Sequence, residues 1–565
     1  MLVGLTAGIA AVILKTVVHY IHIAATHDYQ IPFQNYLHII FPLIGILLTV
    51  FYVKRYRKGK LGRGTSNILH AIAKKSSFLP KDQMYSHMIT SSLTVGLGGS
   101  AGLESPMVTT GSAIGSNYSK TYHVNYKDRT LLLASGAAAG IAAAFNAPIA
   151  GVLFALEVLL VNASISAFIP LLIAAAVGAL CSKIILKEGI LLSFHLQQSF
   201  DYHNLPFYIL MGVVAGFVSL YYARISLKIE SIFKPKKKEK MYLKALIGGT
   251  ILATLIFLFP PLFGEGYESV KILSELKPEK LLEKGIFSGN INNQWFILFF
   301  IGAIVMLKAI ATSVTISSGG SGGNFAPSLF VGAYLGFFFS RSLNMLGITH
   351  LSESNFTIVA MAGILSGVFY APLTAIFLIA EITGGYELMI PLMVVSAVSY
   401  TVTKYFEPYS MDTKRLAKKG HIFTQNKDKN ILSSLKLEKI IETDFHKISP
   451  EATLRSFVEV IAHSKRNIFP VVDDNNVLVG VILLENIREI MFKTELYDQT
   501  LVKQLMRQPA GTVDAEDDMY SVMKKFDETG AWNLPVLENE RYLGFVSKSS
   551  IFTNYRKMLI KSSLG

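Results

Sequence analysis

Gly102-Leu-Glu-Ser-Pro106 has a counterpart later in the chain, Gly323-Asn-Phe-Ala-Pro327, with glycine and proline at the same two positions. Each stretch is followed by two further glycines at identical spacings, Gly111 and Gly115 in the first copy and Gly332 and Gly336 in the second. A scaffold that recurs at fixed spacing indicates two related halves within one chain.

The repetition extends downstream of these glycines. Asn146-Ala-Pro148 opens an apolar run that ends at Glu157, and Tyr370-Ala-Pro372 opens one that ends at Glu381, at the same distance from the proline. Internal repeats in an apolar chain are typical of transporters and channels whose functional site lies where the halves meet.

Composition indicates a membrane protein. The chain has 565 residues, of which 51% are hydrophobic and 16% are charged, whereas soluble domains carry about 25% charged residues. Apolar runs long enough to cross a bilayer recur, and we expect no removable signal peptide before the first. These runs are 2–25, 35–53, 84–100, 162–182, 204–222, 245–263, 296–312, 356–380 and 388–405.

The net charge of +14 is concentrated beside apolar runs, in segments 54–60, 234–244 and 414–419. Basic residues that flank membrane spans mark the cytoplasmic side, so we place these segments in the cytoplasm. This distribution argues against a nucleic-acid partner. The single Cys181 excludes a disulfide within the chain.

The sequence predicts an all-α polytopic membrane domain followed by a smaller α/β domain. We assign 1–225 to a first membrane repeat, 226–244 to a basic cytoplasmic linker, 245–407 to a second repeat and 408–434 to a polar linker. The remainder repeats too: Phe469-Pro-Val-Val and Leu534-Pro-Val-Leu each open a strand, turn, strand and helix pattern. These two units are assigned to 435–498 and 499–565.

Glu104 is the only charged residue between Asp82 and Lys120. A carboxylate at membrane depth is costly unless it is paired, protonated or hydrated, so it marks a functional site. Because Pro106 favours the first turn of a helix, we expect Glu104 at a helix N-terminus, where free N–H groups favour an anion.

The second copy has Phe325 in place of Glu104, and no charged residue occurs from 309 to 340. Two helix N-termini directed at one point would hold a small anion through backbone N–H groups, without the full positive charge that would prevent its release. The predicted anion-binding residues are Gly102, Leu103, Ser105, Gly323, Asn324, Phe325 and Ala326.

Over 1–420 the chain resembles the CLC chloride channel and transporter family in three motifs. Gly102-Leu-Glu-Ser-Pro106 resembles the family's G-[KR]-E-G-P and Gly323-Asn-Phe-Ala-Pro327 resembles its G-x-F-x-P, and Phe145-Asn-Ala-Pro148 between them also matches the family. The C-terminal part resembles a pair of CBS domains. The resemblance implies two inverted repeats, a homodimer with a separate pore in each subunit, and transport of chloride or a similar monovalent anion. It also implies that Glu104 is the gate, occupying the anion's place until protonation moves it aside. We expect a cell-membrane protein with its CBS pair in the cytoplasm.

Two pore positions depart from the family pattern. The family's G-S-G-x-P motif falls at Gly62-Arg-Gly-Thr-Ser66, where Arg63 replaces the anion-binding serine. Arg63 either attracts anions or is a solvated loop residue, and Thr65 or Ser66 could supply the hydroxyl. The family's pore tyrosine corresponds by register to Asp412, while Tyr409 is the nearest tyrosine.

Proton-coupled family members usually carry a second glutamate directly after the position of Glu157. Val158 stands there, which favours passive conduction, with a proton-coupled chloride antiporter as the alternative. Glu157 and Glu381 are expected to be structural, helix-end carboxylates. A CBS-containing cation channel is a remote alternative because it would need clustered acids. No nucleophile or metal cluster suggests an enzyme.

Nucleotide-binding CBS domains hold an adenine nucleotide through a threonine and an aspartate after the second strand. The corresponding residues are Leu483 and Asn486 in the first unit, and Ser547 and Ser550 in the second. We therefore expect no required cofactor and a structural or dimer-stabilising module. Nucleotide binding at Asn486, Ser547 and Ser550 is the alternative.

Overall fold

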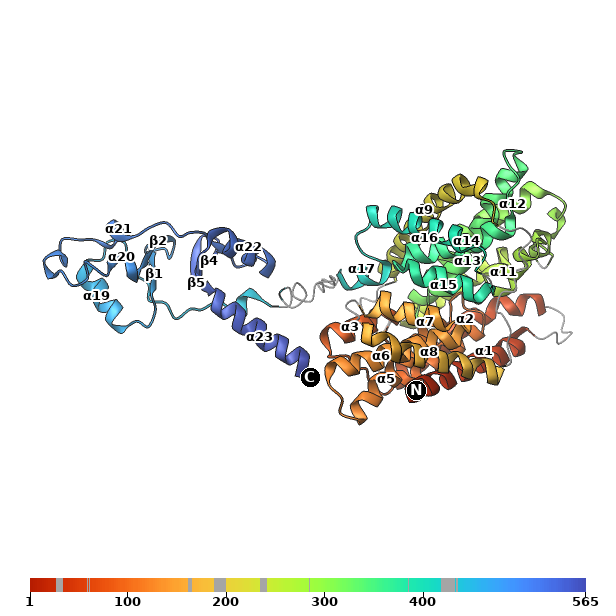
Figure 1. Ribbon diagram of the computed structural model, residues 1–565, viewed down its shortest axis with the longest axis horizontal. Helices are drawn as coiled ribbons and strands as arrows, with labels where there is room; N and C mark the ends of the chain where they lie inside the picture. The colour runs from red at the N-terminus through yellow and green to blue at the C-terminus, as the bar shows by residue number, and fades with distance from the viewer. Residues whose placement is uncertain are drawn as a thin grey trace. The chain divides into compact units, whose positions relative to one another are not determined.

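The computed structural model divides into two compact units, 1–418 and 419–564, here called the membrane unit and the tail unit (Figure 1). Each is described by itself. The structure describes residues 1–26, 34–57, 59, 61–62, 64–160, 165–186, 200–233, 241–283, 285–384, 386–417, 432 and 435–564. Arg63 and all the basic residues in 234–240 and 418–431 therefore lie outside the described residues.

The described part of the membrane unit is helical. Its first helices are α1 (Leu2–Thr26), α2 (Gln34–Tyr56), α3 (Gly64–Lys74), α4 (Gln83–Gly96), α5 (Glu104–Thr121), α6 (Tyr126–Phe145), α7 (Pro148–Phe154) and α8 (Ile165–Leu186). The following helices are α9 (Leu205–Ile232), α10 (Met241–Leu258), α11 (Tyr267–Ser274), α12 (Gln294–Ser317), α13 (Phe325–Met345), α14 (Glu353–Phe369), α15 (Pro372–Thr383), α16 (Met389–Phe406) and α17 (Met411–Ala417).

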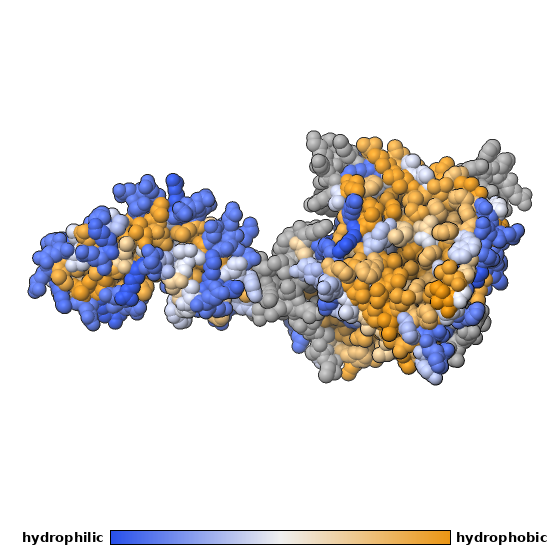
Figure 2. Space-filling model, turned by 90° about the horizontal axis from the view of Figure 1, so that it is seen from above, coloured by the Kyte–Doolittle hydropathy of each residue, from blue (hydrophilic) through white to orange (hydrophobic). Residues whose placement is uncertain are grey.

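Within the described residues, seven segments are helical, long and apolar enough to cross a membrane. Figure 2 shows the corresponding broad hydrophobic surface on the membrane unit, and a largely hydrophilic surface on the tail unit. The apolar run 356–380, expected as one span, is instead two helices, α14 and α15. Tyr370 adopts a left-handed conformation with φ of 60°, and Pro372 begins the new helix, because proline fits the first turn but interrupts a helix interior.

The helix packing repeats with the sequence. Helices α1, α6 and α8 pack on one another, and α9, α14 and α16 do the same. Residue 225, where the sequence places the end of the first half, falls inside α9. In the structure α9 is thus the counterpart of α1, as α13 is of α5, and the second structural repeat begins at α9.

The repeated glycines serve close helix packing. Gly111 and Gly115 of α5 face the backbone of α6 at Gly136 and Leu132. Gly332 and Gly336 of α13 face the backbone of α14 in the equivalent way. A Cβ atom at any of these positions would overlap a neighbouring backbone atom, which explains why the spacing is the same in both halves.

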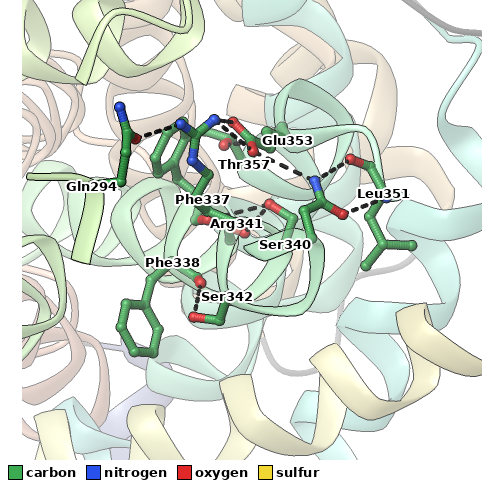
Figure 3. Close-up of polar contacts among 11 residues, drawn as sticks. Gln294, Phe337, Phe338, Ser340, Arg341, Ser342, Leu351, Glu353 and Thr357 are labelled. Atoms are coloured by element: carbon green, nitrogen blue, oxygen red, sulfur yellow. Dashed lines mark hydrogen bonds and ion pairs between the residues drawn. The ribbon is translucent and has the colours of Figure 1, made fainter. Parts of the chain in front are cut away.

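The C-terminal end of α13 is held by a polar cluster (Figure 3). Arg341 pairs with Glu353 in the first turn of α14 at 3.1 Å and donates to Gln294 at the start of α12 at 2.7 Å. Asn344 exchanges two hydrogen bonds with the backbone of Leu351. The cluster fixes α13 against both neighbours at the end opposite to Phe325.

The tail unit contains two small sheets. Strands β1 (Ile468–Val472) and β2 (Leu478–Leu483) are antiparallel; β4 (Asn533–Glu538) pairs parallel with β3 (Val513–Asp514) and antiparallel with β5 (Arg541–Ser547). The α-helices around them are α19 (Leu454–His463), α20 (Leu484–Ile487), α21 (Val502–Leu505), α22 (Met519–Thr529) and α23 (Lys548–Leu564). The beginning of the first CBS unit joins the second sheet, because Glu442 and Phe545 exchange backbone hydrogen bonds of 2.8 and 3.0 Å.

Candidate functional site at the junction of the two halves

The two repeated motifs touch. The N–H of Gly102 donates to the carbonyl of Gly323 at 3.0 Å, and the N–H of Gly323 donates to the carbonyl of Gly102 at 2.8 Å. Helices α5 and α13 both begin two residues after this bridge. Their N-termini, each with free N–H groups and the positive end of a helix dipole, therefore lie beside each other.

Glu104 lies across this junction. It is the first residue of α5 and its exposed fraction is 3%. Its Oε2 accepts a hydrogen bond of 3.3 Å from the N–H of Ala326 in the first turn of α13. Its Oε1 accepts one of 2.8 Å from the hydroxyl of Tyr267. A carboxylate from one half thus occupies the N-terminus of the helix in the other half, a position that favours a negative charge.

Tyr267 and a second acid, Glu265, were missed by sequence reasoning. Glu265 belongs to the turn Gly264-Glu265-Gly266 that leads into α11, and Tyr267 is the first residue of α11. Oε1 of Glu265 accepts a hydrogen bond of 3.0 Å from the N–H of Leu103. The signal available in the sequence was an isolated glutamate between two glycines, directly after the apolar run 245–263.

A cavity of about 320 Å³ opens on one side of Glu104. Five of the site residues predicted from the two repeated motifs line it: Glu104, Ser105, Gly323, Asn324 and Phe325. Gly102, Leu103 and Ala326 lie behind this wall, where they make the backbone contacts described above. Thr65 and Asp412 also line the cavity.

Phe325 forms an aromatic part of the wall. Its ring centroid lies 5.7 Å from that of Phe145, 6.2 Å from that of Phe154 and 5.3 Å from that of Phe369. These rings come from the ends of α6 and α14 and from α7. Apolar walls lower the local dielectric and strengthen the interaction of an ion with nearby N–H groups.

Asp412 lies at another part of the same cavity and is 7% exposed. Its Oδ1 accepts hydrogen bonds from the hydroxyl of Ser66 at 3.0 Å and from Arg415 at 2.9 Å. Arg415 also donates to Glu230 at 2.9 Å. Thr65 lines the cavity while Ser66 is bound to Asp412, which leaves Thr65 as the better placed hydroxyl of the two.

Tyr409 is the other candidate for the family's pore tyrosine. Among the described residues that line this cavity, Tyr409 does not occur. It lines a separate small cleft with Arg224 and Lys414. The structure therefore brings Asp412, and not Tyr409, to the cavity that contains Glu104. Arg63 lies outside the described residues.

Glu157 and Glu381 form reciprocal caps between the halves. Glu157 accepts hydrogen bonds from the N–H groups of Leu373 and Thr374, at 3.0 and 2.7 Å, in the first turn of α15. Glu381 on α15 accepts from the N–H groups of Ile149 and Ala150, at 3.1 and 2.9 Å, in the first turn of α7. Each carboxylate satisfies amides that a helix start leaves without partners.

The candidate nucleotide residues of the tail unit are engaged within the protein. The hydroxyl of Ser547 donates to Glu442 at 2.6 Å, and the N–H of Ser550 donates to Ser547 at 3.0 Å. Glu442 also pairs with Arg466 at 2.7 Å. Asn486 is exposed.

Comparisons with known proteins agree with this architecture. The profile of the family described as voltage gated chloride channel matches residues 44–404, and that of the CBS domain matches 437–493 and 502–557. Chloride channel protein CLC-e of Arabidopsis thaliana is 28% identical over 437 residues, covering 71% of this chain and 59% of that protein. The H(+)/Cl(-) exchange transporter ClcA of Vibrio parahaemolyticus serotype O3:K6 is 29% identical, covering 53% of this chain and 62% of that protein. The chain spans less than two thirds of either relative.

Solved structures share the fold. A slow cyanobacterial Cl-/H+ antiporter matches with a TM-score of 0.63 at 23% identity, covering 74% of this chain and 96% of that one. A eukaryotic CLC transporter matches with a TM-score of 0.61 at 17% identity, covering 97% and 96%. From the paired motifs, the repeated helix packing and the matched profile, the chain is a multi-pass membrane protein that belongs to the voltage-gated chloride channel (CLC) family and carries a C-terminal CBS pair.

Proposed function

We propose that this protein moves chloride or a similar monovalent anion across the membrane through the cavity between its two halves. One observation carries the proposal: the carboxylate of Glu104, itself a monovalent anion, is bound by the N–H of Ala326 and the hydroxyl of Tyr267 where two helix N-termini meet. A place that accepts this carboxylate has the charge and the donors to accept a halide.

In this proposal Glu104 is the gate. Protonation removes the negative charge that holds the side chain on α13, so the side chain leaves and the anion takes its donors. Dipoles and N–H groups bind the ion without a full positive charge, which allows its release. Arg415, a cationic lining residue, is held by Asp412 and Glu230, and this pairing limits how tightly it could retain an anion.

Passive conduction is the form of transport that we favour, because Val158 stands where proton-coupled members usually carry their second glutamate. Proton-coupled exchange is the second candidate. It is supported by the relatives, since ClcA is named as an H(+)/Cl(-) exchange transporter and similar folds belong to antiporters.

Simultaneous measurement of chloride and proton flux in liposomes tests the proposal. We expect chloride efflux from vesicles that contain the purified protein, with no proton movement against its gradient. Uphill proton movement driven by a chloride gradient would contradict passive conduction and support proton-coupled exchange. If neither the native protein nor Glu104→Gln shows chloride flux, the proposal that the protein transports chloride is wrong.

We further propose that the protein is a homodimer with one pore in each subunit, located in the cell membrane with the CBS pair in the cytoplasm. A nucleotide is not required, because the Ser547 hydroxyl that would meet it is bonded to Glu442. Titration calorimetry of the full chain with ATP and AMP should detect no binding. Micromolar binding that Ser547→Ala weakens would contradict this view.

A further inference from the structure

A half-buried acid that the family resemblance does not include, Glu265, lies close to Glu104 and is not among the residues that line the cavity. Glu265 is bound to the N–H of Leu103, the residue before Glu104, at 3.0 Å. Gly264 donates to the carbonyl of Gly98 at 3.0 Å, so the turn that carries Glu265 is fastened to the loop that leads into α5. This turn also leads into Tyr267, which contacts Glu104 directly.

Lys308 provides a positive charge beside this turn. It is fully buried in α12, at 0% exposure. Its ammonium donates to the carbonyl of Gly264 at 3.0 Å and lies 4.5 Å from the ring centre of Phe330. A buried lysine in a membrane helix is costly, and it is retained where its charge has a partner or a role.

We propose that Glu265 and Lys308 set the pH at which the Glu104 gate opens, and that the charge of Glu265 has the larger effect. Lys15 on α1 faces both acids, Lys308 on α12 faces Glu265, and Tyr267 on α11 adds its phenol beside Glu104. Glu265 is bonded to the residue before Glu104, and Tyr267, two residues after Glu265, is bonded to Glu104 itself, so both acids lie at the same junction.

The direction of the effect follows from the signs. The negative charge of Glu265 opposes ionisation of Glu104, so it makes protonation and release of the gate easier. Lys308 acts through Glu265 and in the same direction, since a nearby cation keeps that carboxylate ionised. Leu103 stands where the family usually has lysine or arginine, so the charge near the gate is set here by a different pair of residues.

The inference rests on the proposed function, and pH-dependent anion flux tests both. Glu265→Gln keeps the shape and the acceptor oxygen for Leu103 N–H but removes the charge. It should shift the midpoint of the flux–pH curve to lower pH by about one unit. Lys308→Met should shift it in the same direction, because Glu265 then loses the cation that keeps it ionised. Glu268, an exposed acid in the first turn of α11, supplies the matched control: Glu268→Gln should leave the midpoint unchanged.

The outcomes separate the two proposals. An unmoved midpoint in Glu265→Gln, with normal pH-dependent flux in the native protein, overturns this inference alone. If the native protein shows no anion flux, or flux that does not depend on pH, the proposed gate is wrong and this inference is wrong with it. If Glu265→Gln does not purify as a folded protein, Lys308→Met carries the test, and a midpoint that does not fall overturns the inference.

Discussion

The hydroxyl of Tyr222 donates a hydrogen bond of 3.2 Å to the Oδ1 of Asn324. Tyr222 is fully buried on α9, and Asn324 is the residue before α13 and lines the cavity. Because its oxygen is bound by the phenol, the amide nitrogen of Asn324 is the end left to act as a donor toward the cavity.

Tyr222→Phe should therefore reduce chloride flux. Without the phenol, the amide of Asn324 is free to rotate and present its oxygen, which repels anions. We expect chloride flux to fall several-fold relative to the native protein, with a stability loss of about 1 kcal/mol from the lost hydrogen bond. Tyr221→Phe is the matched control, because the Tyr221 hydroxyl contacts only the Met306 carbonyl among the hydrogen bonds described. Equal flux in both variants would contradict the role of Asn324.

Glu104→Gln should abolish the pH dependence of anion flux. A neutral amide cannot gain or lose the charge that holds this side chain on the amide of Ala326, so flux should stay constant across the pH range in which the native protein is gated. Flux measured in liposomes at a series of symmetric pH values checks this. If the variant kept the native pH profile, Glu104 would not be the gate.

Phe325→Trp should reduce anion flux strongly. The Phe325 ring fills the space among Phe145, Phe154 and Phe369, so a larger ring must project into the cavity or displace these neighbours. Phe299→Trp on α12 is the control, since Phe299 is 72% exposed and has room for a larger ring. Normal flux in Phe325→Trp would count against Phe325 as part of the pore wall.

Glu157→Ala and Glu381→Ala should both destabilise the membrane unit, each by about 2 kcal/mol, because each leaves two helix-start amides without a partner. Thermal unfolding of the purified protein measures the loss. The ratio of proton to chloride movement should not change in either variant. A changed ratio in Glu157→Ala alone would indicate a proton-carrying role and refute the structural one.

The sequence predicted the parts of the fold that depend on local pattern. Pro106 and Glu104 specify a helix start, and Pro148 and Pro372 specify two more, since proline acts on its own turn. The confirmed fold class follows from apolar runs and from the repeated glycines. The start of the second repeat was less visible, because α9 crosses residue 225 as one uninterrupted apolar helix.

The contacts of the site were harder to predict, since they join residues far apart in the chain. Nothing near Glu265 or Tyr267 indicates that their turn lies against Leu103 and Glu104. The choice between Asp412 and Tyr409 likewise depends on how the segment after α16 folds back toward Ser66. Such contacts are set by tertiary packing and not by any local period.

The two hydrogen bonds between Gly102 and Gly323 fasten the two motif loops to each other at the junction through which we propose that the ion passes. A transporter that rocked its halves apart at this point would have to break both bonds in every cycle. Here the scaffold can stay closed while one side chain swings, so a covalent tether between these loops should leave ion passage intact.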